Sequence, residues 1–247
     1  MDGLAFDTTL FYSLFLVTTF LAALVAGLAG FAFGLVAAAV WLYILTPLQT
    51  ATLIIGFGLM VQGYAVWKLR KALDWGRLWP FFLGAAIGVP LGVAIVSWVA
   101  PAQMRAGIGV LLVLYSLHGL ARPSMPPVAA GSAPADAGVG FLNGVLGGAT
   151  GLAGIIATIW CQLRGWPKDQ QRAVFQPVGV ATFAMSAAWL GGRGAISGDT
   201  IKLFVLGLPV LLAGTWVGLK LYGRLDEAGF RQVVLGLLLV SGVALIF

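Results

Sequence analysis

Two clusters of glycine lie inside apolar stretches of the chain: "GLAGFAFG" at residues 27–34 and "GGATGLAG" at residues 147–154. Glycine in the middle of a helix costs about 1 kcal/mol relative to alanine, but it allows a tight turn and the close approach of another backbone or a ligand. A helix that begins after such a turn presents free N–H groups and a positive dipole end, which bind anions without a charged side chain. Each cluster therefore predicts a turn followed by a short helix, beginning near Phe31 in one and near Leu152 in the other.

Amide and hydroxyl side chains accompany these clusters. Gln49 follows Pro47 at the start of one apolar segment, and Gln176 precedes Pro177 early in another. Each polar group has the alternative role of hydrogen bonding to a neighbouring helix. The positions at which we expect a ligand to bind are Gly30, Phe31, Gly34, Gln49, Gly148, Thr150, Gly151, Gly154 and Gln176.

Other glycines are better explained by close helix packing of the small-xxx-small kind. These are Gly84, Gly88 and Gly92 in one apolar run, and Gly214 and Gly218 in another. Both runs read as long uninterrupted helices, so no turn is expected within them.

The composition assigns the chain to a membrane. It is 60% hydrophobic and only 9% charged, with a mean hydropathy of +1.01. Several apolar segments are long enough to cross about 30 Å of hydrocarbon. The apolar segments lie at roughly 10–45, 50–67, 78–99, 105–120, 138–163, 173–190, 201–221 and 232–247. The fold class is therefore all-α integral membrane, and we expect a multi-pass protein of the inner (plasma) membrane.

The two halves of the chain resemble each other. One offset aligns Ala29, Gly34 and Pro47 with Ala149, Gly154 and Pro167, and a second offset aligns Gly88, Gly92 and Arg105 with Gly214, Gly218 and Arg231. Chance matches in an apolar chain are the alternative. We expect a first repeat at 1–120, a Pro- and Ala-rich cytoplasmic linker at 121–137 and a second repeat at 138–247.

The basic residues indicate how the repeats are oriented. Loops 68–77, 164–172 and 220–231 are rich in Lys and Arg, whereas loop 46–49 has no charge. The positive-inside rule assigns the basic loops to the cytoplasm, and this also explains the net charge of +6 without a nucleic-acid partner. Because the charge bias reverses between corresponding loops, we expect two inverted-topology repeats.

Inversion has a consequence for the glycine clusters. If the linker and loop 164–172 are both cytoplasmic, segment 138–163 begins and ends on the same side of the membrane. It must enter and return, and the turn is expected at "GGATG". By symmetry, segment 10–45 returns near "GLAGFAFG". Each half would then hold a Gly-rich broken or re-entrant hairpin plus three transmembrane helices.

The order of these motifs resembles a known family. The first Gly-rich run is followed by Pro47, "QTAT" at 49–52, a basic loop with Asp74 and a Gly-studded helix at 83–92. "GVLGGATGLAG" at 144–154 and "RAV" at 172–174 follow in the second half. Over nearly the whole chain this pattern resembles the TauE/SafE family of sulfite and organosulfur-anion exporters. The family often has consecutive glycines in both hairpins, whereas this chain has Phe31, Ala32 and Phe33 in the first.

The resemblance implies a membrane transporter, in the direction of export, for small anions such as sulfite, organosulfonates or related organic acids. The apolar bulk in the first hairpin makes a larger organic anion as plausible as sulfite. The alternatives are an integral membrane enzyme and a non-transporting scaffold subunit. An enzyme is disfavoured because the chain has one His, one Cys and no carboxylate in an expected span. We expect no catalytic residues, metal or cofactor. The partners are a small anionic substrate and membrane lipids, and a homo-oligomer stays open.

Overall fold

The computed structural model describes residues 8–71, 73–95, 101–121, 132–192, 196–224 and 226–246. These residues form helices, with no strand in the described ranges. In chain order the helices are α1 (Thr8–Ala29), α2 (Phe33–Ile44), α3 (Pro47–Leu69), α4 (Trp75–Ile95), α5 (Pro101–Ala121), α6 (Ala133–Thr150), α7 (Ile155–Leu163), α8 (Lys168–Gly192), α9 (Gly198–Tyr222) and α10 (Glu227–Ile246).

Five helices are long and apolar enough to cross a membrane: α1, α3, α4, α8 and α9. Shorter apolar stretches lie in α2, α5 and α10. An α-helix rises about 1.5 Å per residue, so the 22 residues of α1 are long enough for the hydrocarbon layer. The chain is a multi-pass, all-α membrane protein.

Glycines bring helices from the two halves of the chain into close contact. Helix α4 packs on α6, α1 packs on α9, α3 packs on α8 and α5 packs on α10. A Cβ atom added to Gly84 of α4 would lie 2.6 Å from the backbone nitrogen of Phe141 in α6. A Cβ atom added to Gly214 of α9 would lie 2.5 Å from the carbonyl oxygen of Phe20 in α1. The expectation that the glycines of α4 and α9 serve close packing is therefore confirmed.

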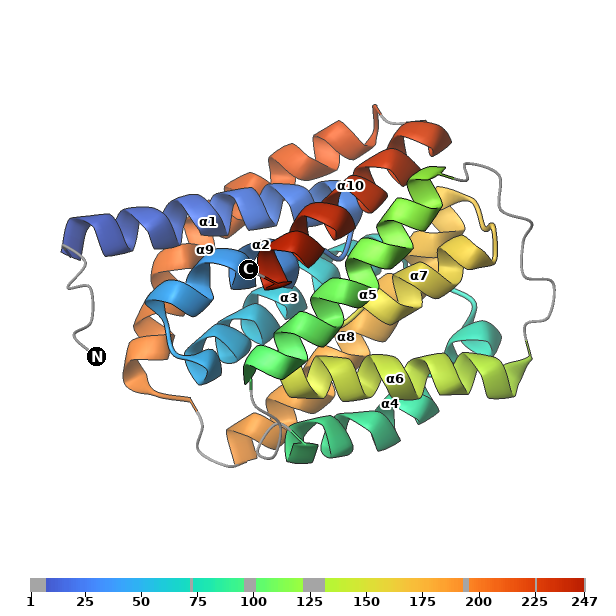
Figure 1. The fold of residues 1–247 in the computed structure, drawn as a ribbon, viewed down its shortest axis with the longest axis horizontal. Coiled ribbons are helices and arrows are strands. Elements are labelled where there is room, and N and C mark those ends of the chain that lie inside the picture. Colours follow the sequence, from blue (N-terminus) through green and yellow to red (C-terminus); the bar gives the residue numbers. More distant parts are fainter. Residues whose placement is uncertain are drawn as a thin grey trace.

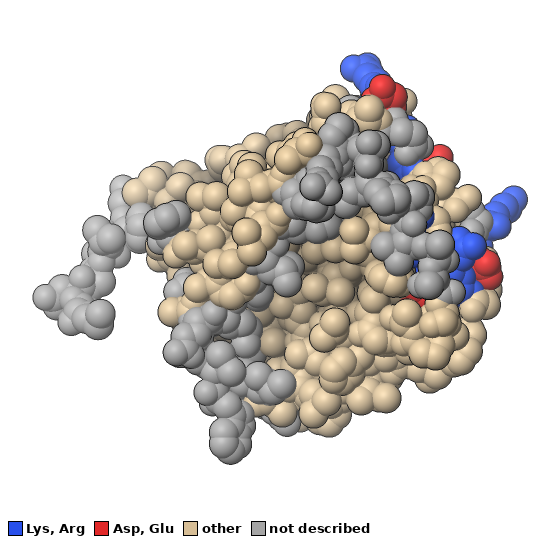
Figure 2. Space-filling view, turned by 45° about the vertical axis from the view of Figure 1, so that its right-hand side comes forward, with Lys and Arg blue, Asp and Glu red and all other residues tan. Residues whose placement is uncertain are grey.

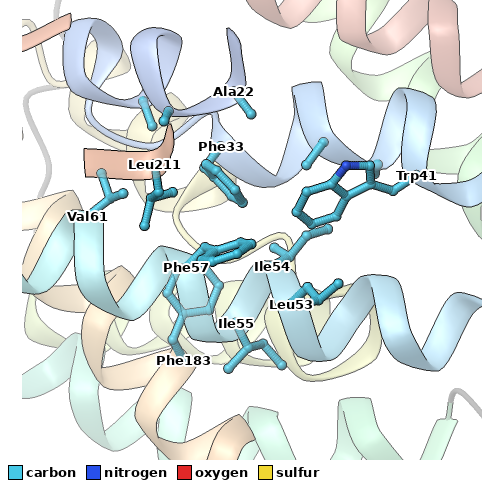
Figure 3. Close-up of a cluster of buried hydrophobic side chains, with 14 of the residues drawn as sticks. Ala22, Phe33, Trp41, Leu53, Ile54, Ile55, Phe57, Val61, Phe183 and Leu211 are labelled. Carbon is cyan, nitrogen blue, oxygen red and sulfur yellow. The ribbon is translucent and has the colours of Figure 1, made fainter. Parts of the chain in front are cut away.

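The short helix α2 is held by an aromatic cluster (Figure 3). The ring of Phe33 lies 5.9 Å from that of Trp41 and 5.7 Å from that of Phe57 in α3, centroid to centroid. Edge-to-face aromatic pairs of this kind contribute about 1 kcal/mol beyond the area that they bury. All three side chains are buried, so the first turn of α2 is fixed against α3.

The helix ends separate into two groups. Helices α3 and α9 begin at the left-hand end of Figure 1, whereas α4, α8 and α10 begin toward the right. Lys and Arg gather at the right-hand end of the face that Figure 2 shows, and the rest of that face is almost free of charge. At this right-hand end α3, α7 and α9 finish and α4 and α8 begin (Figure 1). The basic residues at or next to these helix ends are Lys68, Arg70, Lys71, Arg77, Arg164, Lys168, Lys220 and Arg224. The expected basic loops therefore lie on one side of the molecule.

Helix α6 begins within the stretch that was expected to be a linker. It starts at Ala133, with Pro134 in its first positions and Asp136 in its first turn. Proline is favoured at the start of a helix, and a carboxylate there complements the dipole. Residues 133–137 of the predicted linker therefore form the first turn of α6. Residues 122–131 lie outside the described residues.

Candidate functional site

The first hairpin turns at Gly30. Helix α1 ends at Ala29, and α2 begins at Phe33 after a short non-helical stretch. Gly30 has a φ of 92°, a left-handed conformation that costs other residues about 1–2 kcal/mol. A Cβ atom added to Gly30 would also lie 2.8 Å from the side-chain nitrogen of Gln176. The expected break is present, and α2 begins slightly later than the expected Phe31.

The second hairpin turns between Gly151 and Gly154, whose φ values are 73° and 98°. Thr150 fixes the entry to this turn. Its hydroxyl donates to the carbonyl oxygen of Leu146 at 2.7 Å and accepts a hydrogen bond from the N–H of Leu152 at 3.1 Å. Thr150 therefore holds the end of α6 and the first residues of the turn together.

The turn lies later than the predicted "GGATG" and shares only its last residue, Gly151. Gly147 and Gly148 remain within α6, and the turn occupies "GLAG" at 151–154, so that α7 begins at Ile155 and not near Leu152. A Cβ atom added to Gly148 would lie 2.5 Å from the carbonyl oxygen of Val89 in α4. Gly148 is thus a packing glycine, and the structure does not bring it into the turn.

The two turns touch each other. A Cβ atom added to Gly154 would lie 3.6 Å from the Cβ of Phe31. One added to Gly34 would lie 2.9 Å from a methyl carbon of Leu152 and 3.6 Å from the carbonyl oxygen of Gly151. The side chains of Phe31 and Leu152 are only 3% and 5% exposed. We call this meeting point of Gly30–Gly34 with Gly151–Gly154 the hairpin crossing.

Both returning helices start at the crossing without a capping side chain. The N-cap residues are Ala32 for α2 and Gly154 for α7, and neither helix has an acidic residue in its first turn. The first N–H groups of a helix have no partner within it, and they carry the positive end of the dipole. Two such ends at one buried point form a site suited to an anion.

Asn143 of α6 holds the second turn in place. Its side-chain oxygen accepts a hydrogen bond from the N–H of Gly154 at 2.9 Å, and its nitrogen donates to the hydroxyl of Thr182 in α8 at 3.2 Å. Both side chains are fully buried. The amide therefore links the start of α7 to α8, and a buried polar link of this kind specifies a single position for the turn.

Two buried glutamines have amide atoms without partners among the described residues, and one of them, Gln176, contacts the first turn. The side-chain nitrogen of Gln176 donates to the carbonyl oxygen of Gly30 at 3.4 Å, and its side-chain oxygen has no partner among the described residues. Gln62 of α3 lies against Gly179 of α8, and neither atom of its amide has a partner in the described chain. Both side chains are 2% exposed. Buried polar groups are nearly always hydrogen bonded, so these amides are candidates for contact with a ligand.

Sequence reasoning missed Gln62 and the role of Arg172. The guanidinium of Arg172 donates to the carbonyl oxygens of Gly27 and Leu28 at 2.8 and 2.6 Å, and it lies 3.6 Å from the ring centroid of Tyr222. It therefore caps the C-terminal end of α1. The available signals were an amide in the middle of the apolar helix α3, at Gln62, and the spacing of Arg172 one helical turn before Gln176.

Gln49 lies apart from the crossing. It is in the first turn of α3, where its side-chain oxygen accepts a hydrogen bond from the N–H of Thr46 at 3.2 Å in a capping box. It also lines a separate hollow of about 710 Å³ with Asp199 and Lys202 of α9. The structure thus gathers Gly30, Phe31, Gly34, Gly151, Gly154 and Gln176, with Thr150 at their edge, and leaves out Gln49 and Gly148.

Comparisons with known proteins give the family of the chain but no individual relative. No curated protein and no solved structure matches the sequence. The family model described as "Sulfite exporter TauE/SafE" matches residues 15–245, which include both hairpin turns and at least the greater part of every helix. This chain therefore belongs to the TauE/SafE sulfite exporter family, whose members are membrane transporters.

Proposed function

We propose that this chain exports small anions, such as sulfite, organosulfonates or related organic acids, and that it binds them at the hairpin crossing. The observation that carries this proposal is the contact between two uncapped helix starts deep in the protein. The amide nitrogen of Gln176, which donates to the carbonyl oxygen of Gly30, places a further N–H donor at the first turn and supports it. Backbone N–H groups and amide nitrogens bind an anion while leaving it free to depart, because neither forms a full ion pair.

The surroundings of the crossing favour an anion that carries some apolar surface. Phe31 and Leu152 pack into the crossing, and the ring of Phe31 lies 5.7 Å from that of Phe175. An organic sulfonate or carboxylate places its charged group at the helix starts and its carbon atoms against these rings. Sulfite has only the charged group. The proposal therefore includes organic acids together with sulfite.

An inverted repeat accounts for the helix pairing. In our proposal α1–α5 and α6–α10 are equivalent sets, related by an axis in the membrane plane. The pairing of α1 with α9 then corresponds to the pairing of α6 with α4. Helix α3 packs on its own equivalent, α8, and α5 packs on its own equivalent, α10. Each pair contains one helix from each half. This exchange supports two inverted repeats with the crossing at their interface, the usual place of a transporter's binding site.

The side of the membrane follows from the charges. The basic helix ends lie together, at the end of the molecule where α3 and α9 finish. The positive-inside rule supports a cytoplasmic position for this end. In this orientation α1 enters from outside and α6 from the cytoplasm, so that the two hairpins reach the crossing from opposite sides.

The membrane potential supplies enough free energy for export. Moving one elementary charge through 100 mV is worth about 2.3 kcal/mol, which corresponds to a concentration ratio of about fifty-fold. An anion leaving a cell that is negative inside gains this free energy without a coupling ion. Because the crossing is buried, the hairpins must move relative to each other during each cycle to open it first to one side and then to the other.

Transport into proteoliposomes tests the proposal. The panel consists of radiolabelled sulfite, an organosulfonate and a monocarboxylate, each compared with protein-free liposomes. Gly151→Leu should abolish transport, because Gly151 has a φ of 73°, a left-handed conformation that strains any residue with a Cβ atom. Gly236→Leu is the matched control, since nothing lies within 4 Å of a Cβ atom at Gly236. Equal transport by the two variants contradicts a site at the crossing.

A further inference from the structure

A groove between α3 and α9 has the chemistry of a lipid site. Its volume is about 390 Å³, and its apolar lining includes Met60 of α3 and Leu212 of α9. Both of these side chains are exposed on the outer surface of the bundle. Lys68 and Lys220 stand at one end of the groove. We propose that this groove binds an anionic phospholipid, with the phosphate at the two lysines and an acyl chain along the apolar lining.

The two lysines are arranged for an anion. The ammonium of Lys220 lies 3.6 Å from the ring centroid of Trp216, and that of Lys68 lies 4.8 Å from that of Tyr64. In the described chain no carboxylate oxygen lies within 4 Å of either ammonium. Aromatic rings orient the cations without neutralising them. Two positive charges therefore face one end of an apolar groove.

The depth of the groove fits a lipid. Lys68 and Lys220 lie in the last turns of α3 and α9, at the basic end of the molecule. From Met60 to Lys68 the helix rises about 12 Å at 1.5 Å per residue, which carries the groove from the interface into the acyl region. Clusters of basic residues between membrane helices on the cytoplasmic side bind anionic headgroups in this way.

A polar atom beside the groove also lacks a partner. Thr215 lines the groove and is 7% exposed, and its hydroxyl has no hydrogen-bond partner among the described residues. Helical threonine hydroxyls usually bond to a backbone carbonyl of the preceding turn, and the phosphate or ester oxygens of a lipid would satisfy this one. Val61 of α3 and Leu211 of α9 also line the groove, and they join it to the aromatic cluster around α2 (Figure 3).

Native mass spectrometry with added lipids tests this site. The probes are phosphatidylglycerol, phosphatidylcholine with matched acyl chains, and glycerol 3-phosphate as a headgroup without chains. The groove variant is Lys68→Gln with Lys220→Gln. The matched control is Lys71→Gln with Arg224→Gln, which removes the same charge from the same end of the molecule but from outside the groove.

The wild-type protein should bind phosphatidylglycerol more tightly than phosphatidylcholine and should ignore glycerol 3-phosphate. Each basic residue near an anionic lipid contributes about fivefold in affinity, so the groove variant should bind phosphatidylglycerol about 25-fold more weakly. The control variant should keep the wild-type affinity. Equal affinities in the two variants, equal binding of both lipids, or a lipid-free dimer that covers the groove would each overturn the proposal. None of these readouts depends on anion transport.

Discussion

Arg172 of α8 donates a hydrogen bond to the carbonyl oxygen of Leu28, the residue before the last of α1, at 2.6 Å. The same guanidinium nitrogen also donates to the carbonyl oxygen of Gly27 at 2.8 Å. The last carbonyl groups of a helix have no partner within it, and at membrane depth water does not replace one. A single cation from the second half of the chain thus terminates the long helix of the first hairpin.

Replacing this cation should destabilise the protein. Arg172→Met keeps an unbranched apolar stem but removes the guanidinium with both charged hydrogen bonds, and we expect a loss of about 3 kcal/mol in the free energy of unfolding. Thermal unfolding in detergent measures the effect as a lower melting temperature. Arg70→Met, at an exposed position, is the control and should leave the melting temperature unchanged. If the two variants unfold at the same temperature, Arg172 does not anchor α1.

Asn143→Leu should loosen the second turn. The change removes the acceptor for the N–H of Gly154 and the donor to Thr182, with an expected loss of about 2 kcal/mol. Hydrogen–deuterium exchange over residues 151–155 should become faster, because the start of α7 is released. Thr182→Val removes only the link to α8 and should accelerate exchange less. Unchanged exchange in Asn143→Leu would show that the amide does not fix the turn.

Substitution of the two buried glutamines, Gln62 and Gln176, should separate anion binding from protein stability. Their free amide atoms contribute little to folding, so Gln62→Leu and Gln176→Leu should unfold close to the wild-type temperature. If the amides contact the anion, KM for transport should rise about tenfold or more in each variant. Gln170→Leu, at an exposed position of α8, should change neither quantity. A wild-type KM in both buried variants would remove the glutamines from the site.

Cysteine labelling tests the proposed sidedness. In a Cys161→Ala background, Ser197→Cys at the start of α9 should react with an impermeant maleimide added to intact cells. Ser132→Cys before α6 should react only after the membrane is permeabilised. Both serines are exposed, so access to the reagent depends on the side of the membrane and not on burial in the protein. The opposite labelling pattern would reverse the orientation of the whole chain.

Glycine spacing predicted the breaks and the packing faces but not which glycine serves which purpose. Gly148 and Gly151 stand in the same cluster, yet the first is held against Val89 of α4 and the second turns the chain. The difference depends on a helix that lies far away in the sequence. The glycine pattern alone therefore placed the turn too early.

The polar residues show the same limit. Gln49 looked like a ligand-binding residue because it follows a proline, but its amide completes a local capping box with Thr46. Arg172 looked like one of the basic loop residues, but it is 4% exposed and contacts a backbone 145 residues away in the sequence. The role of Arg172 depends on tertiary packing, which no local pattern contains, whereas the capping box of Gln49 is local and has a sequence signature in Thr46 and Gln49.

Anion flux under an imposed membrane potential tests the central claim most directly. Proteoliposomes without any gradient of the anion, protons or sodium receive a potassium–valinomycin potential of either sign. For the wild-type protein we expect the flux of sulfite or an organic anion to follow the sign of the potential and to ignore added proton or sodium gradients, while Gly151→Leu should give none. Accumulation driven by a proton gradient at zero potential would contradict potential-driven export. Equal flux through Gly151→Leu would contradict passage through the hairpin crossing.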